Sequence, residues 1–475
     1  MSSKRISLVW FRQDLRLADN PALSAAAAAG QVLPVYILDD FNAGDWKMGS
    51  ASRAWLHGSL QALDRSLEGK LQFFSGDARA IIATLVESLP IDAVYWNRCY
   101  EPWRIERDAQ IKAALARRGV AAHSYNASLL WEPWTVSKGD GTPYRVFTPY
   151  YRKGCLSRPA PRQPLDRPRE LRFVEPAAVN GVPLAALELL PSPDWHRNML
   201  KDWEIGEQAA QRSLESFCAS ALEIYREGRD FPATGATSRL SPHLHFGELS
   251  PQQAWHRIDN AAMHVEGDGP GHFLRELAWR EFSYYLLYHF PQLPERNFNS
   301  KFDDFQWLGD DEGLQAWQRG LTGFPIVDAG MRELWQTGYM HNRVRMIVAS
   351  FLIKNMLLHW RTGADWFWDC LVDADLASNS ASWQWCAGSG ADAAPYFRIF
   401  NPVLQSEKFD PQGEYLLRYC PELGGLPLRY RHKPWEAPPE VLKAAGLRLG
   451  VDYPKPILDL KTTRERALAR FKALA

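Results

Sequence analysis

The feature that most constrains the fold is a change in the period of apolar residues about a third of the way along the chain. Strand-like runs occur at 6–10, 32–38, 71–74, 92–96 and 120–125. They alternate with helical stretches near 20–29, 50–68, 77–88 and 103–118. Alternation of this kind predicts a parallel sheet with helices on both faces. This part has neither GxGxxG nor GxxxxGK[ST], so we assign it no dinucleotide.

The second half of the chain has a helical period instead. Helices are predicted at 207–226, 250–261, 271–290, 325–338, 340–360 and 461–474. A Pro- and Arg-rich segment without periodicity precedes them and is typical of a connector. We therefore predict an α/β domain at 1–135, a linker at 136–203 and an all-α domain at 204–475.

Composition excludes several classes of protein. The chain of 475 residues is 46% apolar and has a net charge of +0, so most of it is not disordered. Because the overall charge is balanced, binding of nucleic acid would require a local basic face. The best membrane-span candidate, 347–360, is interrupted by Lys354 and Asn355, which excludes a span. The apolar run at 6–11 is too short for a secretory signal. Six scattered cysteines indicate free thiols in a reducing cytoplasm.

Two short polar segments have alternative interpretations. The hydroxyls of 237–241 precede a helix, where they form either a phosphate site or a plain N-cap. His243 and His245 are two residues apart and face away from each other on a helix, so we expect packing or capping and no metal site.

Asp373 and Asp375 begin like a calcium loop, but Ala377 and Ser378 stand where a ligand and a glycine are needed. These carboxylates need cationic partners, for which Arg343 and Arg345 are candidates, or they lie in a solvated loop.

The stretch 330–364 is basic and aromatic, which fits either a nucleic-acid surface or a solvated helix face. Its basic residues are Arg332, Arg343, Arg345, Lys354 and Arg361. Ten of the 20 tryptophans lie between 279 and 435, and this density reflects either a large aromatic core or a functional role.

Six motifs in one order identify a resemblance. They are WFRQDLR at 10–16, TSRLS at 237–241, ELAWREF at 276–282, GFPIVD at 323–328, MHNR at 340–343 and the segment 373–385. Over nearly its whole length the chain resembles the photolyase/cryptochrome family. The resemblance implies an α/β antenna domain, a long linker and an all-α domain that binds FAD.

The resemblance also implies individual cofactor contacts. The 237–241 hydroxyls would bind the FAD phosphates, Asp373 would pair with Arg345, and Asn342 and Asn379 would lie close to the isoalloxazine ring. The full set of implied FAD ligands is Tyr225, Thr237, Ser238, Arg239, Leu240, Ser241, Arg280, Asn342, Arg345, Asp373, Ala374, Asp375 and Asn379.

The implied activity is light-dependent repair of cyclobutane pyrimidine dimers by electron transfer from excited reduced FAD to a flipped-out dimer. Trp279, Asn342, Met346 and Trp385 all have the form found in such repair enzymes. In plant cryptochromes, the position that corresponds to Asn342 is an Asp. In (6-4) photolyases, the positions that correspond to Asn342 and Met346 are histidines. The alternative is a blue-light photoreceptor without repair activity.

The resemblance further implies roles in repair. Glu276 and Asn342 would hydrogen-bond the pyrimidines, and Trp307, Trp360 and Trp383 would carry electrons to oxidised flavin. Implied DNA contacts are Arg229, Glu276, Trp279, Arg280, Asn342, Arg343, Met346, Trp385, Arg398, Gln405 and Lys408.

The antenna chromophore is less constrained. Trp103 and Arg104 stand where one branch has a folate-binding Asn-Glu pair, whereas 243–248 and 438–457 resemble the bacterial class III branch and plant cryptochromes. We expect 5,10-methenyltetrahydrofolate, with 8-hydroxy-5-deazaflavin as the second choice and an empty site as the third. We also expect a monomer in the bacterial cytoplasm, at the nucleoid when bound to damaged DNA.

Overall fold

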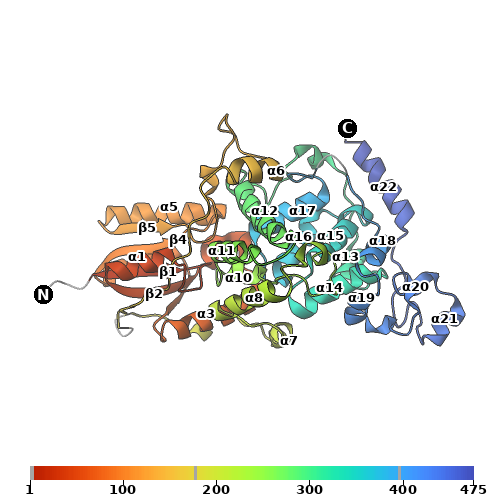
Figure 1. The fold of residues 1–475 in the computed structure, drawn as a ribbon, viewed down its shortest axis with the longest axis horizontal. Helices are drawn as coiled ribbons and strands as arrows, with labels where there is room; N and C mark the ends of the chain where they lie inside the picture. The colour runs from red at the N-terminus through yellow and green to blue at the C-terminus, as the bar shows by residue number, and fades with distance from the viewer. Residues whose placement is uncertain (1–4, 176–178, 394–396, 475) are drawn as a thin grey trace. The chain divides into compact units, whose positions relative to one another are not determined.

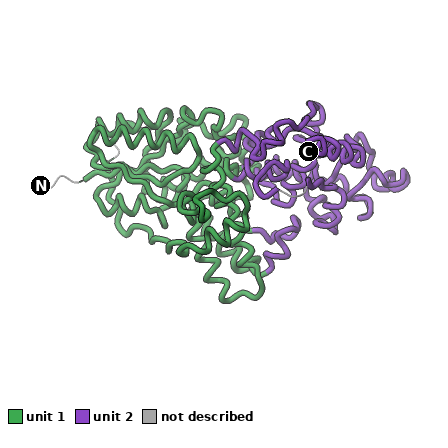
Figure 2. The backbone as a smooth tube through the Cα atoms, turned by 90° about the horizontal axis from the view of Figure 1, so that it is seen from above, with its two compact units in different colours: residues 1–223, 238–291, 372–377 green, residues 224–237, 292–371, 378–475 purple. Residues whose placement is uncertain are grey.

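The computed structural model describes residues 5–175, 179–393 and 397–474. The chain forms two compact units, each built from segments far apart in sequence (Figure 2). Unit 1 comprises residues 1–223, 238–291 and 372–377, and unit 2 comprises 224–237, 292–371 and 378–475.

Unit 1 contains the predicted parallel sheet (Figure 1). Its strands are β1 (Ile6–Phe11), β2 (Gln31–Leu38), β3 (Gln72–Ser75), β4 (Ile91–Asn97) and β5 (Ala121–Tyr125), paired in the order β3-β2-β1-β4-β5. All four pairings are parallel. The connecting helices are α1 (Pro21–Ala29), α2 (Asp40–Ala43), α3 (Ser50–Ser66), α4 (Ala78–Ser88) and α5 (Pro102–Arg117). The α/β prediction is confirmed.

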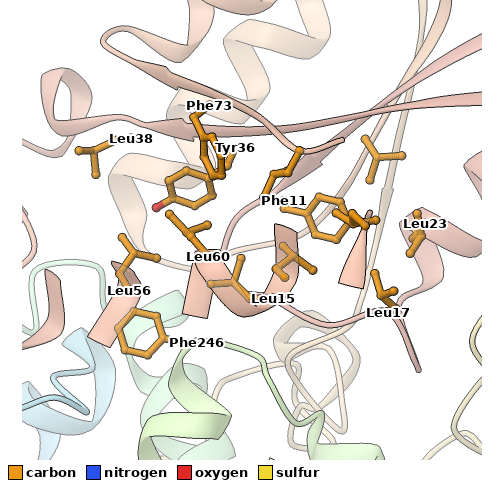
Figure 3. Close-up of a cluster of buried hydrophobic side chains, with 14 of the residues drawn as sticks. Phe11, Leu15, Leu17, Leu23, Tyr36, Leu38, Leu56, Leu60, Phe73 and Phe246 are labelled. Carbon is orange, nitrogen blue, oxygen red and sulfur yellow. The ribbon is translucent and has the colours of Figure 1, made fainter. Parts of the chain in front are cut away.

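Both faces of this sheet are buried, and β1 shows why. Val9 and Phe11 belong to one apolar cluster, and Leu8 and Trp10 belong to the other. Successive side chains of a strand point to opposite faces, so each face of β1 contributes to a different core. Figure 3 shows the first cluster, in which Phe246 from the later part of the chain also packs.

The remainder of unit 1 is irregular and helical. The predicted linker contains α6 (Phe147–Pro149), a π-helical turn η3 (Tyr150–Cys155) and α7 (His196–Leu200). It is followed by α8 (Glu207–Ser220), α10 (Ser241–His245), α11 (Pro251–Ala262) and α12 (Gly269–His289). The predicted helix at 207–226 ends at Ser220, because the chain turns before the short α9 (Tyr225–Gly228) of unit 2.

Among the described residues of unit 2, the regular elements are helices, joined by loops. Its longer helices are α13 (Asp311–Arg319), α14 (Pro325–Thr337), α15 (Asn342–Ser350), α16 (Trp360–Cys370), α18 (Pro402–Phe409), α19 (Glu414–Tyr419), α21 (Pro439–Ala444) and α22 (Leu460–Lys472). α17 (Leu376–Ala387) begins in unit 1 and continues in unit 2.

The single helix predicted at 340–360 is wrong. α15 ends at Ser350, a π-helical turn η7 (Phe351–Asn355) follows, and α16 begins only at Trp360. Leu357 has a φ of 57°, which breaks the helix, and the His359 side chain caps the next one. The apolar pattern continues through this break, so periodicity alone joins the two helices. Among the described residues, no helix has the length and apolar content to cross a membrane.

Candidate functional site

The implied FAD ligands are distributed over both units. Unit 1 contains Ser238, Arg239, Leu240, Ser241, Arg280, Asp373, Ala374 and Asp375, and unit 2 contains Tyr225, Thr237, Asn342, Arg345 and Asn379.

The segment 238–241 presents hydroxyls at the start of α10. Ser241 is the first residue of this helix and is exposed, and Ser238 Oγ accepts the Leu240 N–H at 3.4 Å. Arg239 has a left-handed φ of 51°, and its guanidinium lies 4.0 Å from the centroid of the Trp203 ring. A non-glycine residue holds that conformation only when its surroundings impose it. An exposed hydroxyl at a helix start suits a phosphate group.

Asp375 lies in a buried polar cluster of unit 1. Its carboxylate accepts the Tyr284 hydroxyl and lies 3.6 Å from His245 Nδ1. Burial opposes ionisation, but His245 and Tyr284 outweigh it and hold the pKa of Asp375 well below its ordinary value. Asp373 is also buried, so the solvated-loop interpretation of this segment is wrong.

The two histidines of the His-x-His pattern have separate partners. His243 Nδ1 pairs with Glu248, and both side chains are buried. His245 lies beside Asp375. Within residues 5–175, 179–393 and 397–474, no three His, Cys, Asp or Glu side chains form a group that could hold a metal ion. All six cysteines are free thiols.

α12 places Glu276, Trp279 and Arg280 within little more than one turn, and residues three and four apart share a helix face. The Trp279 indole is half-buried, with the ring of Phe147 stacked 3.8 Å from its centroid. Arg280 Nη1 donates to the Ser128 carbonyl at 2.7 Å. Both side chains are thus fixed by contacts to the segment that follows the sheet.

Glu281 is a buried acid that the sequence analysis missed. Its exposed fraction is 2%, and its carboxylate accepts the Leu130 N–H at 2.7 Å. Burial raises the pKa of Glu281 to about 7, although Arg280 lies beside it. A signal was present in the sequence, because position 281 falls on the apolar stripe of α12 between Leu277 and Tyr285.

In unit 2, α15 begins at Asn342, whose side chain is exposed. The preceding His341 caps this helix, since its Nδ1 accepts the Arg343 N–H at 3.2 Å. Burial lowers the pKa of His341 to about 4, so the ring is neutral. Arg343 pairs with Asp230 at 2.7 Å instead of with the two aspartates for which it was a candidate.

Two further implied FAD ligands are oriented by backbone carbonyls. Arg345 Nε donates to the Met340 carbonyl at 2.7 Å, and Asn379 Nδ2 donates to the Ala364 carbonyl at 3.0 Å. The Asn379 bond uses an amide N–H, so the amide oxygen is left to accept a hydrogen bond from a ligand.

Predicted DNA-contacting cations gather around Phe409 in unit 2. The Arg343 guanidinium and the Lys408 ammonium lie 4.4 and 5.0 Å from the centroid of this ring. Lys408 is exposed at the end of α18, one turn after the half-buried Gln405.

Elsewhere in this unit, Trp385 and the exposed Arg398 line a cavity of about 40 Å³. Arg229 lies 5.4 Å above the ring of Tyr225.

The nucleic-acid-surface interpretation of 330–364 is weakened at three of its five basic positions, one of which is Arg343 with its partner Asp230. Lys354 is 1% exposed and donates to the Ala387 carbonyl at 2.9 Å, and burial holds its pKa well below the ordinary value. Arg332 pairs with Glu422 at 2.7 Å.

The three tryptophans implied in electron transfer all belong to unit 2. The ring of Trp383 packs against Gly363 in the first turn of α16. The approach is so close that a Cβ added at Gly363 would lie 2.1 Å from the ring. Trp360 starts that turn, and the His359 ring lies 5.5 Å from Trp360 and 5.2 Å from Trp307. Trp383 and Trp360 are buried, whereas Trp307 is half-buried. Trp307 is therefore the most exposed of the three.

Comparison with known proteins places this geometry in a family. Residues 7–169 match the family described as DNA photolyase, and residues 273–473 match the FAD binding domain of DNA photolyase. The chain is 50% identical to the deoxyribodipyrimidine photo-lyase of Agrobacterium fabrum over 98% of both chains. The chain belongs to the photolyase/cryptochrome family.

Solved structures and plant relatives of this family agree with that membership. The crystal structure of a bacterial class III photolyase from Agrobacterium tumefaciens matches with a TM-score of 0.95 and 48% identity, covering 100% of this chain and 98% of that one. Cryptochrome-1 of Arabidopsis thaliana is 38% identical over 97% of this chain and 69% of its own length. The predicted family and fold class are confirmed, including a helical FAD-binding domain. The domain boundaries and the individual site residues stay predictions.

Proposed function

We propose that the protein repairs cyclobutane pyrimidine dimers in DNA under blue light, as a deoxyribodipyrimidine photo-lyase. The observation that carries this proposal is the match to photo-lyases of the same family over essentially the full length of both chains. Similarity to plant cryptochromes favours a blue-light photoreceptor as the second candidate.

We propose that FAD is bound by the ligands named above, and the described side chains suit it. Ser238 and Ser241 offer hydroxyls for its phosphates, and the anionic Asp375 is held by Tyr284 and His245. The Asn379 amide oxygen is positioned as an acceptor for a flavin N–H. When bound, reduced and excited by light, FAD supplies the electron that splits the dimer.

For the DNA substrate, we propose that a flipped-out dimer is bound by apolar and polar side chains together. Flipping costs a few kcal/mol, and less at a damaged pair. Trp279 and Trp385 would contact the pyrimidine rings with Met346, and stacking on an aromatic ring contributes roughly 1–3 kcal/mol per base. Glu276 and Asn342 would hydrogen-bond the bases.

Phosphate contacts would position the DNA without reading its sequence. We propose Arg229, Arg280, Arg343, Arg398, Gln405 and Lys408 for this role. Lys408 supports it best, because it is exposed at the end of α18, whereas Arg343 is already paired with Asp230.

We propose that Trp383, Trp360 and Trp307 deliver electrons from the surface to oxidised flavin. The packing of Trp383 on the turn that begins with Trp360, and the shared neighbour His359, supply close ring contacts for such transfer. The half-buried Trp307 would then react with an external reductant.

For the antenna chromophore we propose 5,10-methenyltetrahydrofolate over a deazaflavin. Parallel sheets bind ligands beyond the strand ends where the strand order reverses, here between β1 and β4. Arg12 directly follows β1 and pairs with Asp108 at 2.5 Å, and the Arg12 and Arg107 guanidinium groups lie 4.7 and 4.6 Å from the centroid of the Trp10 ring. Mass analysis of the chromophore released from purified protein distinguishes the two. We further propose a cytoplasmic monomer.

The repair proposal is tested with purified, reduced protein and oligothymidine that contains cyclobutane dimers. Recovery of the thymine absorbance under blue light, and none in the dark, is the expected result. Bound and photoreducible FAD without recovery would favour the photoreceptor.

A further inference from the structure

Behind Trp279 lie two aromatic rings from the predicted linker. The ring of Phe147 lies 3.8 Å from the indole with the two planes 9° apart, and the ring of Tyr151 follows at 5.8 Å and 10°. Phe147 and Tyr151 are four residues apart in the helical segment of α6 and η3, which places them on one side. Figure 1 shows this segment beside α12. We call Tyr151, Phe147 and Trp279 the aromatic stack.

Phe147 is fixed by the core of unit 1. Its exposed fraction is 4%, and its ring meets Phe282 edge-on at 5.9 Å. The next linker residues are tied to the same helix, because Tyr150 packs 4.7 Å from Tyr285. The Tyr285 hydroxyl also accepts the backbone N–H of Tyr144 at 3.0 Å. The Phe147 ring therefore cannot turn without disturbing several buried contacts.

This packing determines which surface of Trp279 a ligand can use. One face of the indole is covered by Phe147, and Phe282 meets it at 5.9 Å and 71°. A base can therefore stack only on the opposite face, and the half-buried side chain keeps part of its surface accessible. A ring that is already held in its binding orientation loses less conformational freedom when the ligand binds.

We propose that Phe147 is a positioning residue for the damaged DNA: it holds the Trp279 indole so that a flipped pyrimidine stacks on it as the fourth ring of the aromatic stack. The linker segment 144–151 thereby belongs to the lesion-binding machinery. This inference rests on the proposed role of Trp279 in repair.

The test replaces the ring while keeping an apolar side chain. Phe147→Leu should raise the Kd for dimer-containing DNA by about 3- to 10-fold, the range that loss of an aromatic pair produces. Its affinity for undamaged single strands should stay unchanged, and the effect on repair should fall on KM rather than on the rate at saturating DNA. Phe147→Tyr keeps the stacked ring and should restore the affinity.

A matched control separates this effect from general loss of packing. Phe217→Leu removes a buried ring of the same unit that packs against Phe273 at 4.9 Å, and it should leave the Kd for dimer DNA unchanged. In a Trp279→Ala background, Phe147→Leu should have no further effect on that Kd, because the two residues act through one interaction.

Three results would overturn the inference: wild-type affinity in Phe147→Leu, an equal loss in Phe217→Leu, or an undiminished effect of Phe147→Leu in the Trp279→Ala background. Failure of the proposed function is distinguishable from all three. In that case the wild-type protein itself would show no preference for dimer-containing DNA and no repair.

Discussion

Glu281→Gln should remove a pH dependence from the stability of unit 1. The Glu281 carboxyl is buried on α12, where it accepts the Leu130 N–H and lies 3.2 Å from Arg280 Nη1. Burial is the largest cause of its raised pKa and outweighs Arg280 and the backbone hydrogen bonds. A glutamine has nearly the shape of the protonated acid and does not titrate.

The sign of the pH dependence follows from whether the folded or the unfolded state binds the Glu281 proton more tightly. The folded protein has a pKa of about 7 at Glu281, and the ordinary value is 4.5, so the folded state holds the proton over this interval. The stabilisation is complete below the unfolded pKa and is lost as the pH rises through the folded one. The difference between the two values corresponds to roughly 3 kcal/mol of unfolding free energy.

The measurement is urea unfolding of wild type and Glu281→Gln between about pH 5 and pH 8, the interval in which this group changes its charge. The unfolding free energy of the variant relative to wild type should increase with pH by up to about 3 kcal/mol. Glu266→Gln removes an exposed acid of the same unit and serves as the matched control. Parallel pH profiles for wild type and Glu281→Gln would refute the reasoning.

Three further predictions concern the proposed site. Asn342→Asp should abolish most repair while FAD content is retained, since a carboxylate beside the bases opposes arrival of an electron. The number of dimers repaired per absorbed photon measures the loss, and a wild-type yield would contradict the prediction. Trp383→Phe should abolish photoreduction of oxidised flavin, followed by absorbance, yet leave repair by chemically reduced protein intact. Unchanged photoreduction would remove Trp383 from the electron path. Lys408→Ala should weaken binding to all DNA sequences and reduce the dependence of log Kd on log salt by about one, with Lys443→Ala on the exposed α21 as a control of equal charge.

The fold of the first 130 residues follows from local pattern. Each predicted strand is present within one or two residues, because buried parallel strands such as Ile6–Phe11 consist of short apolar runs bounded by turns. The break between α15 and α16 is different. Leu357 is apolar and takes a left-handed conformation only because the surrounding packing imposes it, and no apolar periodicity records that.

Candidate site residues could be named from the sequence only where motifs contain them. Asn342 and Asp375 lie in motifs that the resemblance identifies, but their neighbours depend on tertiary contacts. The Asp230 that pairs with Arg343 is 113 residues away along the chain. Phe147 lies in a segment that the sequence predicts only as a connector. Its contact with Trp279 of α12 is a tertiary contact, and no pattern in the neighbouring sequence indicates it.

The proposed reaction of this protein is the catalytic cleavage of the cyclobutane ring of a pyrimidine dimer. The most direct measurement irradiates a single-dimer oligonucleotide in excess over reduced protein with blue light and separates the products by chromatography. Several undamaged oligonucleotides formed per protein molecule, and none in the dark, is the predicted result. Intact dimers after irradiation, with FAD bound and reduced, would contradict the account.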